Sequence, residues 1–339
     1  MAPWAKPGGT TVAFVETVKG PVDTAGLGNT LMHEHVFVVT PEIEHEYPEW
    51  SWDGSKHDRQ TEAIGKLQAL KAAGVSTIVD LTVLGLGRSV EALVPVARET
   101  DVNIIVATGM YTFDHLPAFI SRRPPVHPHS SDGDVLVDFF VKDITVGIGD
   151  TGVKAAVLKC CTEVKGVTPN IHRVLRAVAR AHRLTGVPIS THSNVWHQTG
   201  RDQQRVFAEE GVDLSRVVIG HSGDTADTDY LKELMDRGST IGMDRFGLYN
   251  HPHLTFDQRV QVVATLCADG YADRMVLSHD TMCVMDDFPG FFEANPSWVY
   301  THVSDQVLPA LRDRGVSDAQ IDQMLVGNPQ RIFAQHGGY

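Results

Sequence analysis

The sequence predicts an α/β protein that folds as a (β/α)8 barrel, also called a TIM barrel. Three observations support this prediction: short β-branched runs alternate with longer segments of helical period, eight such runs occur, and most are apolar throughout. Strands of that kind are typical of a parallel sheet with both faces covered. Eight of them favour a closed barrel over an open sheet, and 339 residues suit this fold. We expect a single barrel domain over residues 1–339.

The eight expected strands are 29–38, 75–82, 103–109, 154–159, 187–192, 216–221, 239–244 and 274–280. Helices are expected between them. The segment 168–186 is the clearest, because Thr168 suits the N-cap, Pro169 the first turn and Gly186 the end. Three further segments have the same pattern and also end in glycine: 199–211, 225–238 and 257–270.

Composition narrows the class of protein. The chain is 42% hydrophobic, so it can bury a large core, and its formal net charge of −13 argues against a nucleic-acid partner. No apolar run is long enough to span a membrane. The N-terminal 20 residues lack the apolar core of a secretory signal, so we expect a cytoplasmic protein. The four cysteines form no CxxC pair, and no GxGxxG or Walker A motif predicts nucleotide binding.

Metal-capable side chains gather at the expected strands. On the first strand His33 and His35 point to the same face, while Glu34 points to the other. An HxH pair alone is common, so it needs partners elsewhere. Four later strands end in such partners: Lys159, His192, His221 and Asp280. Because active sites of barrels form at the carboxyl ends of the strands, we expect these six groups to meet there.

The chemistry of this set suits divalent metal ions. Imidazole and carboxylate ligands bind Zn²⁺, Mn²⁺, Co²⁺ or Fe²⁺, and four histidines with one aspartate could serve two ions. A lysine ammonium is only a donor, so Lys159 is either a structural cation or a modified side chain that presents oxygen atoms. Reaction of its neutral amine with CO₂ would give such a group. That reaction needs a lowered lysine pKa, which burial beside other cations provides.

The motifs resemble one known family over nearly the whole chain. HEH on the first strand, the lysine that closes the fourth, THS and GHSGD after the fifth and sixth, and SHD on the eighth resemble the phosphotriesterase family of the amidohydrolase superfamily. The stretches GMYTFDHLP, GMDRFGL and EEGVDLSRVVIGHSGDT are most similar to phosphotriesterase-like lactonases, especially actinobacterial ones.

The resemblance implies a binuclear metal centre at the carboxyl-terminal face of the strands, with zinc, cobalt, manganese or iron as the ions. His33, His35 and Asp280 would hold the more buried ion. The other ligands would hold the more exposed ion: His192, His221 and a bridging N6-carboxylysine at Lys159. A water between the two ions would lose a proton near neutral pH and become the nucleophile.

The resemblance also implies the reaction. Asp280 would handle protons, while Tyr111 and Arg245 would line the pocket, with the Tyr111 hydroxyl as a further donor to the developing oxyanion. The expected substrates are small lactones, above all N-acyl-homoserine lactones, so that the enzyme would quench quorum sensing. Phosphotriester hydrolysis would be a side activity, and the family implies a homodimer.

Three alternatives stay open at this stage. A phosphotriesterase is the nearest, since the same nucleophile can attack phosphorus. A metal-binding protein without catalysis is the second, and intact ligands argue against it. A deaminase is the third, but such enzymes manage with one metal and no bridging lysine.

The aromatic segment 285–298 also has two interpretations. It contains Phe288, Phe291, Phe292 and Trp298. These residues either line a channel for an acyl chain or form a small core of their own or a subunit contact.

Overall fold

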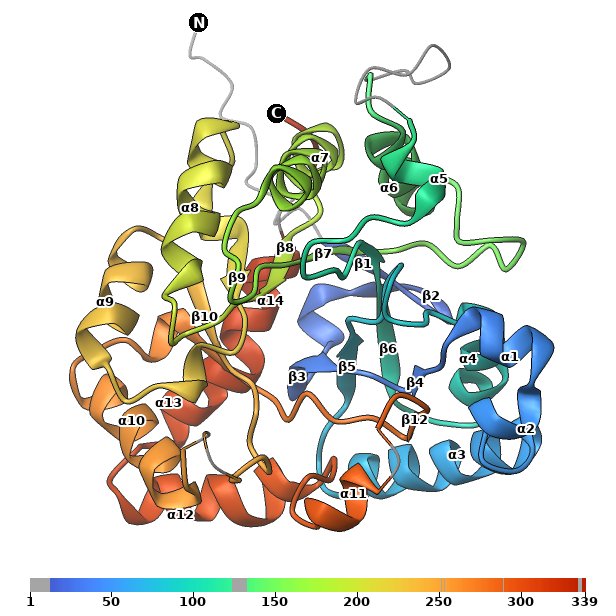
Figure 1. Cartoon of the computed structure of the whole chain (residues 1–339). Coiled ribbons are helices and arrows are strands. Elements are labelled where there is room, and N and C mark those ends of the chain that lie inside the picture. The colour runs from blue at the N-terminus through green and yellow to red at the C-terminus, as the bar shows by residue number, and fades with distance from the viewer. Residues whose placement is uncertain (1–12, 124–132, 251, 253, 289, 335–336) are drawn as a thin grey trace, which may run out of the picture.

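The computed structural model describes residues 13–123, 133–250, 252, 254–288, 290–334 and 337–339. The expectation of a cytoplasmic protein rests on the N-terminal 20 residues, and residues 1–12 of this stretch lie outside the described residues. Apart from one hairpin and several short helices and strands, the described chain alternates strands with helices (Figure 1).

Eight parallel strands form the barrel, and each overlaps one expected run. In spatial order they are β3 (Thr30–Glu34), β5 (Thr77–Asp80), β6 (Asn103–Gly109), β7 (Val157–Cys161), β8 (Ile189–His192), β9 (Val217–Ile219), β10 (Thr240–Met243) and β11 (Met275–Leu277). Backbone bonds across the two ends complete the ring: the Asp280 N–H donates to His33 O at 3.0 Å, and the His35 N–H donates to Thr281 O at 2.9 Å. The predicted (β/α)8 barrel is confirmed.

Helices cover the outside of this ring (Figure 1). The four predicted helices are α7 (Pro169–Thr185), α8 (Thr199–Glu209), α9 (Thr228–Asp236) and α10 (Phe256–Ala268). The Thr168 hydroxyl caps α7 by accepting from Ile171 N at 3.3 Å, and Gly186 ends it at φ 80°. Only glycine fits at that position, because a Cβ would collide with Gly337 O.

The remaining elements complete the layer and the two ends of the barrel. The other helices are α1 (Pro41–Glu46), α2 (Pro48–Ser51), α3 (Lys56–Ala72), α4 (Val90–Arg98), α5 (Ala118–Ser121), α6 (Val135–Thr145), α11 (Phe291–Ala294), α12 (Leu308–Asp313), α13 (Asp318–Asp322) and α14 (Asn328–Phe333). The hairpin is β1 (Phe14–Thr17) with β2 (Gly20–Asp23), and β4 (Phe37–Val38) pairs with β12 (Val284–Met285).

Four expected strand ends were wrong. The run 29–38 is broken after Glu34, because the N–H groups of His35 and Val36 turn to Thr281 O and the Asp80 carboxylate. The fourth strand continues beyond Lys159 to Cys161, which is paired with His192. The sixth and eighth runs are shorter than expected, since β9 ends at Ile219 and β11 at Leu277.

The core has two layers. Apolar side chains inside the barrel form one cluster, closed at its lower end by Leu27 and Phe333. A larger cluster fills the space between strands and helices. All four cysteines are buried and free. In the part of the chain that the structure describes, no helix has the length and apolar character needed to cross a bilayer.

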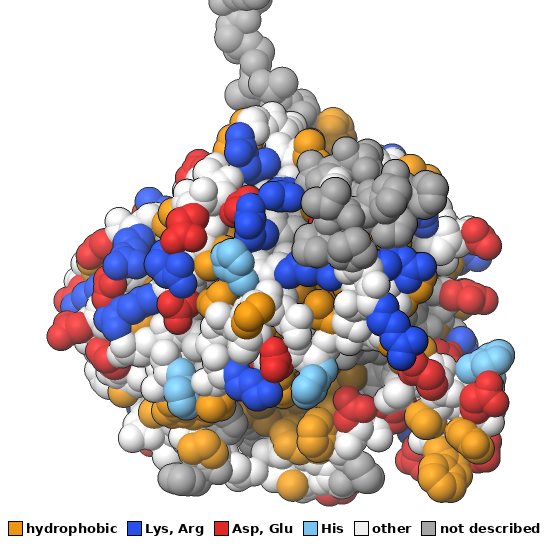
Figure 2. Space-filling view, turned by 45° about the horizontal axis from the view of Figure 1, so that its top comes forward, with side chains coloured by type: hydrophobic (Ala, Val, Ile, Leu, Met, Phe, Trp, Pro, Cys, Tyr) orange, Lys and Arg blue, Asp and Glu red, His pale blue; other side chains and the backbone are white. Residues whose placement is uncertain are grey.

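The surface mixes both signs of charge. On the face drawn in Figure 2, Lys and Arg side chains lie among Asp and Glu side chains. Surface ion pairs occur among such residues, for example Arg205 with Glu209 at 3.0 Å. Such pairs contribute little to stability.

Candidate metal centre

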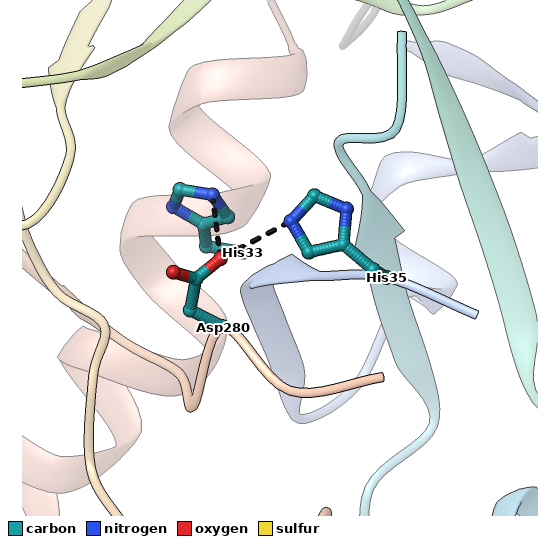
Figure 3. A group of neighbouring side chains, drawn as sticks. All are labelled: His33, His35 and Asp280. Carbon is teal, nitrogen blue, oxygen red and sulfur yellow. Dashed lines mark hydrogen bonds and ion pairs between the residues drawn. The ribbon is translucent and has the colours of Figure 1, made fainter. Parts of the chain in front are cut away.

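The first part of the predicted site lies where β3 and β11 meet. Asp280 Oδ1 is 3.1 Å from His35 Nε2 and 3.3 Å from His33 Nε2, as Figure 3 shows. Lys159 Nζ lies 2.7 Å from the same Nε2 of His33. These four side chains are buried, Asp280 least so at 9% exposure. His33, His35 and Asp280 therefore present nitrogen and oxygen to one point.

The second part adjoins the first. The His221 ring stacks on the His33 ring with centroids 4.7 Å apart, and the His192 ring meets the His221 ring edge-on at 4.4 Å. His221 Nε2 is 3.7 Å from Asp280 Oδ2. The structure thus brings all six predicted ligands into a single buried cluster, although their strands are scattered along the chain.

Asp244 organises two of the histidines and was missed in the sequence. Its Oδ2 lies 2.7 Å from His33 Nδ1, and its Oδ1 lies 3.1 Å from His221 Nδ1 and 2.8 Å from His221 N. These three groups could themselves be considered a metal-binding set. Because the distances are those of direct hydrogen bonds, we interpret Asp244 as the acceptor that orients both rings. Its place at the end of the expected strand 239–244 is the signal that could have identified it.

The other two histidines are oriented in the same way. His35 Nδ1 lies 2.8 Å from Thr82 Oγ1, which in turn donates to Asp80 at 2.5 Å. His192 Nε2 lies 2.7 Å from Glu163 Oε1. Glu163, which follows β7, was also missed. The second ring nitrogen of each histidine is therefore engaged, and the free nitrogens face the cluster: Nε2 of His33, His35 and His221, and Nδ1 of His192.

Burial sets the protonation of the cluster. It lowers the pKa of His192 to about 4 and that of His221 well below its ordinary value. Burial also raises the pKa of Asp244, but the neighbouring His221 and His33 more than offset this and hold it well below the usual range. Neutral imidazoles beside an ionised carboxylate are the form in which these groups bind metals. The donor set therefore fits a pair of divalent ions.

Lys159 is suited to the chemical modification considered above. It is 1% exposed, and burial lowers its pKa to about 8, although Asp280 and Asp244 oppose the change. Among the described residues, its Nζ hydrogen-bonds only to His33 Nε2. Strands β6 and β7 lie very close together here, as shown by the collision that a Cβ on Gly109 would make with Lys159 O. A buried lysine of this pKa presents a substantial fraction of neutral, nucleophilic amine near neutral pH.

Two candidate ligands have a strained backbone. His221 and Asp280 both have φ 58°, in the left-handed region that residues other than glycine rarely adopt. Each such residue costs about 1–2 kcal/mol. The surrounding hydrogen bonds must hold these conformations, and strain of this kind is concentrated at functional sites.

Tyr111 and Arg245 both border the cluster. The Tyr111 hydroxyl lies 3.5 Å from His192 Nδ1, a long contact, and burial raises the pKa of this phenol well above its ordinary value. Arg245 Nε donates to Asp280 Oδ2 at 3.0 Å. On its other side Arg245 pairs with Asp224 at 2.9 Å, and Asp224 pairs with the buried Arg259 at 2.7 Å. A row of alternating charges thus leads from α10 to Asp280.

The aromatic segment forms a small core of its own. Trp298 is 4% exposed and packs on Phe291 and Phe292, with ring centroids 5.1 and 5.7 Å apart, whereas Phe288 stays 60% exposed. A cavity of about 390 Å³ lies against Phe292 and Trp298. The inner residues of this segment, Phe291, Phe292 and Trp298, therefore form a small core of their own, which was one of the two interpretations.

Comparison with known proteins gives consistent results. The model of the phosphotriesterase family matches residues 13–333. A "Phosphotriesterase homology protein" of Mycobacterium tuberculosis is 52% identical over 328 residues, 96% of this chain and 99% of that one. An "Aryldialkylphosphatase" of Saccharolobus solfataricus is 34% identical over 320 residues, 93% and 98% of the two chains. The solved structure of the phosphotriesterase from Mycobacterium tuberculosis superposes with a TM-score of 0.92 at 51% identity, covering 96% of this chain and 100% of that chain.

Proposed function

We propose that this chain, which belongs to the phosphotriesterase family, is a metal-dependent hydrolase that opens lactone rings. N-acyl-homoserine lactones are the proposed substrates, which makes the protein a quorum-quenching enzyme with a side activity toward phosphotriesters. One observation carries the proposal: four oriented histidines, a buried lysine and an aspartate converge beside a phenol and a guanidinium.

The six ligands would hold two divalent ions. His33, His35 and Asp280 would hold one, and His192 and His221 the other, with zinc, cobalt, manganese or iron as candidates. Ions bound there would supply a Lewis acid and acidify a water molecule. The neutral amine of Lys159 would attack the carbon of CO₂ and lose a proton, giving N6-carboxylysine with two oxygens to bridge the ions.

Asp280 is the proposed carrier of the proton. Its side chain reaches the mouth of the barrel and contacts both the histidines and Arg245. Arg245 stays charged, so it cannot accept a proton and can only fix the carboxylate. Asp280 would therefore take the proton released when water attacks the ring carbonyl and deliver it to the alkoxide that leaves as the ring opens.

Tyr111 is the proposed donor to the substrate oxygen. Because burial raises its pKa, the phenol keeps its proton and can donate a hydrogen bond. A donor aimed at the oxygen where charge develops stabilises the transition state more than the ground state.

A phosphotriesterase is the second candidate, favoured by the name of the Saccharolobus relative. The test compares kcat/KM for a panel of N-acyl-homoserine lactones with kcat/KM for an aryl phosphotriester, on one metal-replete preparation. We expect a large margin for the lactones. A large margin for the phosphotriester would refute the lactonase assignment and the proposed role of Tyr111. The Tyr111→Phe variant is the control for the proposed role of the Tyr111 hydroxyl, since it removes only that group.

We also propose a cytoplasmic homodimer. Tyr47 and Trp50, at the ends of α1 and α2, are 54% and 76% exposed and in ring contact. Large aromatic side chains that remain exposed are typical of protein interfaces. Light scattering on the wild type and on Trp50→Glu tests this, because a dimer held by this surface should dissociate in the variant.

A further inference from the structure

Glu34, the residue between the two histidines of β3, has no role in the proposed function, yet it is 0% exposed. Alternate residues of a strand point to opposite faces, so Glu34 faces away from the metal centre. Its carboxylate instead reaches across the seam that closes the barrel. Within the described part of the chain, the donors to this carboxylate belong to residues 278–281, which follow β11.

The contacts enclose Asp280 from both sides. Glu34 Oε1 accepts from the Ser278 hydroxyl at 3.0 Å, from His279 N at 2.9 Å and from His279 Nδ1 at 2.7 Å. Glu34 Oε2 accepts from Thr281 N at 3.0 Å. The residues immediately before and after Asp280 are therefore both fixed to one carboxylate.

The His279 ring is held in one tautomer. Val303 N donates to His279 Nε2 at 2.8 Å, so the ring proton sits on Nδ1 and is donated to Glu34. The Trp298 indole N–H donates to His279 O at 2.7 Å. The peptide that leads into Asp280 thus has fixed partners on three sides.

We propose that Glu34 is a positioning residue that holds Asp280 in register with His33 and His35, so that the three side chains can share one metal ion. The inference rests on the proposed metal centre. Asp280 has the left-handed φ of 58°, a conformation uncommon outside glycine that the surrounding hydrogen bonds hold in place. Without the carboxylate, four hydrogen bonds around this conformation are lost, and Asp280 relaxes away from the two histidines.

The test is Glu34→Gln, which places an NH₂ group against at least one of the donors. We expect Co²⁺ affinity to fall at least tenfold and the visible absorption spectrum of the bound Co²⁺ to change. The matched control is Asp143→Asn on α6, a buried carboxylate bonded to Arg88 and Thr108 at 2.8 and 2.7 Å. This control should lose stability but keep the affinity and the spectrum. Wild-type affinity and spectrum in Glu34→Gln would overturn the proposal.

Ser278→Ala is the milder variant in case Glu34→Gln does not fold. It removes one of the four donors to Glu34 together with the acceptor of the His33 N–H at 2.8 Å, and a loss of Co²⁺ affinity with a change in spectrum is expected; no change in either would also overturn the proposal. These measurements need no substrate. A wild type that binds Co²⁺ in this Glu34-dependent way but hydrolyses no lactone would refute the proposed activity alone. Failure of the wild type to bind Co²⁺ would refute both.

Discussion

Replacing Asp244 with asparagine should weaken the binding of one metal ion and leave the barrel folded. Asp244 accepts three hydrogen bonds, two of them from the rings of proposed ligands: His33 Nδ1 at 2.7 Å and His221 Nδ1 at 3.1 Å. Asparagine has the same shape but only one acceptor oxygen. Its NH₂ group must therefore face one of the two rings.

An NH₂ group opposite Nδ1 affects Nε2, the ring nitrogen that is proposed to bind the metal. A histidine whose Nδ1 faces an NH₂ group takes the tautomer with its proton on Nε2, and a protonated Nε2 cannot bind a metal. The ring otherwise loses a charge-assisted hydrogen bond of about 1.5–3 kcal/mol. Both routes agree with the 10- to 100-fold loss of affinity, about 1.4–2.8 kcal/mol, that follows loss of an orienting partner.

The assay is equilibrium dialysis against buffered Zn²⁺, with circular dichroism to check the fold. The variant should bind one ion with nearly wild-type affinity and the second 10- to 100-fold more weakly. Asp143→Asn serves again as the control for loss of a buried carboxylate. Two ions held at wild-type affinity in Asp244→Asn would show that Asp244 does not orient the ligands, and the reasoning would fail.

Three further predictions follow from the same structure. Asp280→Asn should nearly abolish turnover of every substrate with an unchanged circular dichroism spectrum; near wild-type kcat would reject its role in proton transfer. Metal-free protein should recover activity faster when Zn²⁺ is added with bicarbonate than without, and an equal rate would argue against carboxylation of Lys159. Burial lowers the pKa of His302 from 6.5 to about 4. Because the unfolded chain then binds a proton that the folded chain refuses, stability should fall as the pH drops from 6.5 to 4. Urea unfolding of His302→Gln should show a smaller fall than the wild type, and an identical fall would contradict this origin.

The sequence was sufficient to predict the barrel and to identify six side chains that the structure brings together, because both depend on local patterns. Apolar runs bounded by glycine mark strands wherever they occur, and His192 or Asp280 next to such a run marks its carboxyl end. The residues that orient these side chains could not be predicted from local patterns. Asp244 meets His33 across 211 positions, and Glu163 meets His192 across 29. No local pattern announces such a pairing, which depends on the final register of β7, β8 and β10.

The strand ends failed for a related reason. Repeated apolar residues predict where a strand passes, but the hydrogen bonds that terminate it come from other segments. His35 leaves the sheet because Thr281 O captures its N–H, and that carbonyl belongs to the far end of the chain. The left-handed turns at His221 and Asp280 are likewise imposed by tertiary contacts, against the ordinary preference of both residues.

The closure of the barrel between β3 and β11 also orders events during synthesis. His35 and Asp280 are separated by 245 positions, so a ribosome must release almost the whole chain before the two can meet. Contacts of such long range are slow to form, since the loop between them must first lose its freedom. The earlier strands can pair while the chain is still growing, but the ion proposed to bind His33, His35 and Asp280 could be captured only afterwards. The rate of metal uptake in a refolding experiment would therefore report when the barrel closes. Because the ion binds only the closed barrel, its binding would stabilise that state against unfolding.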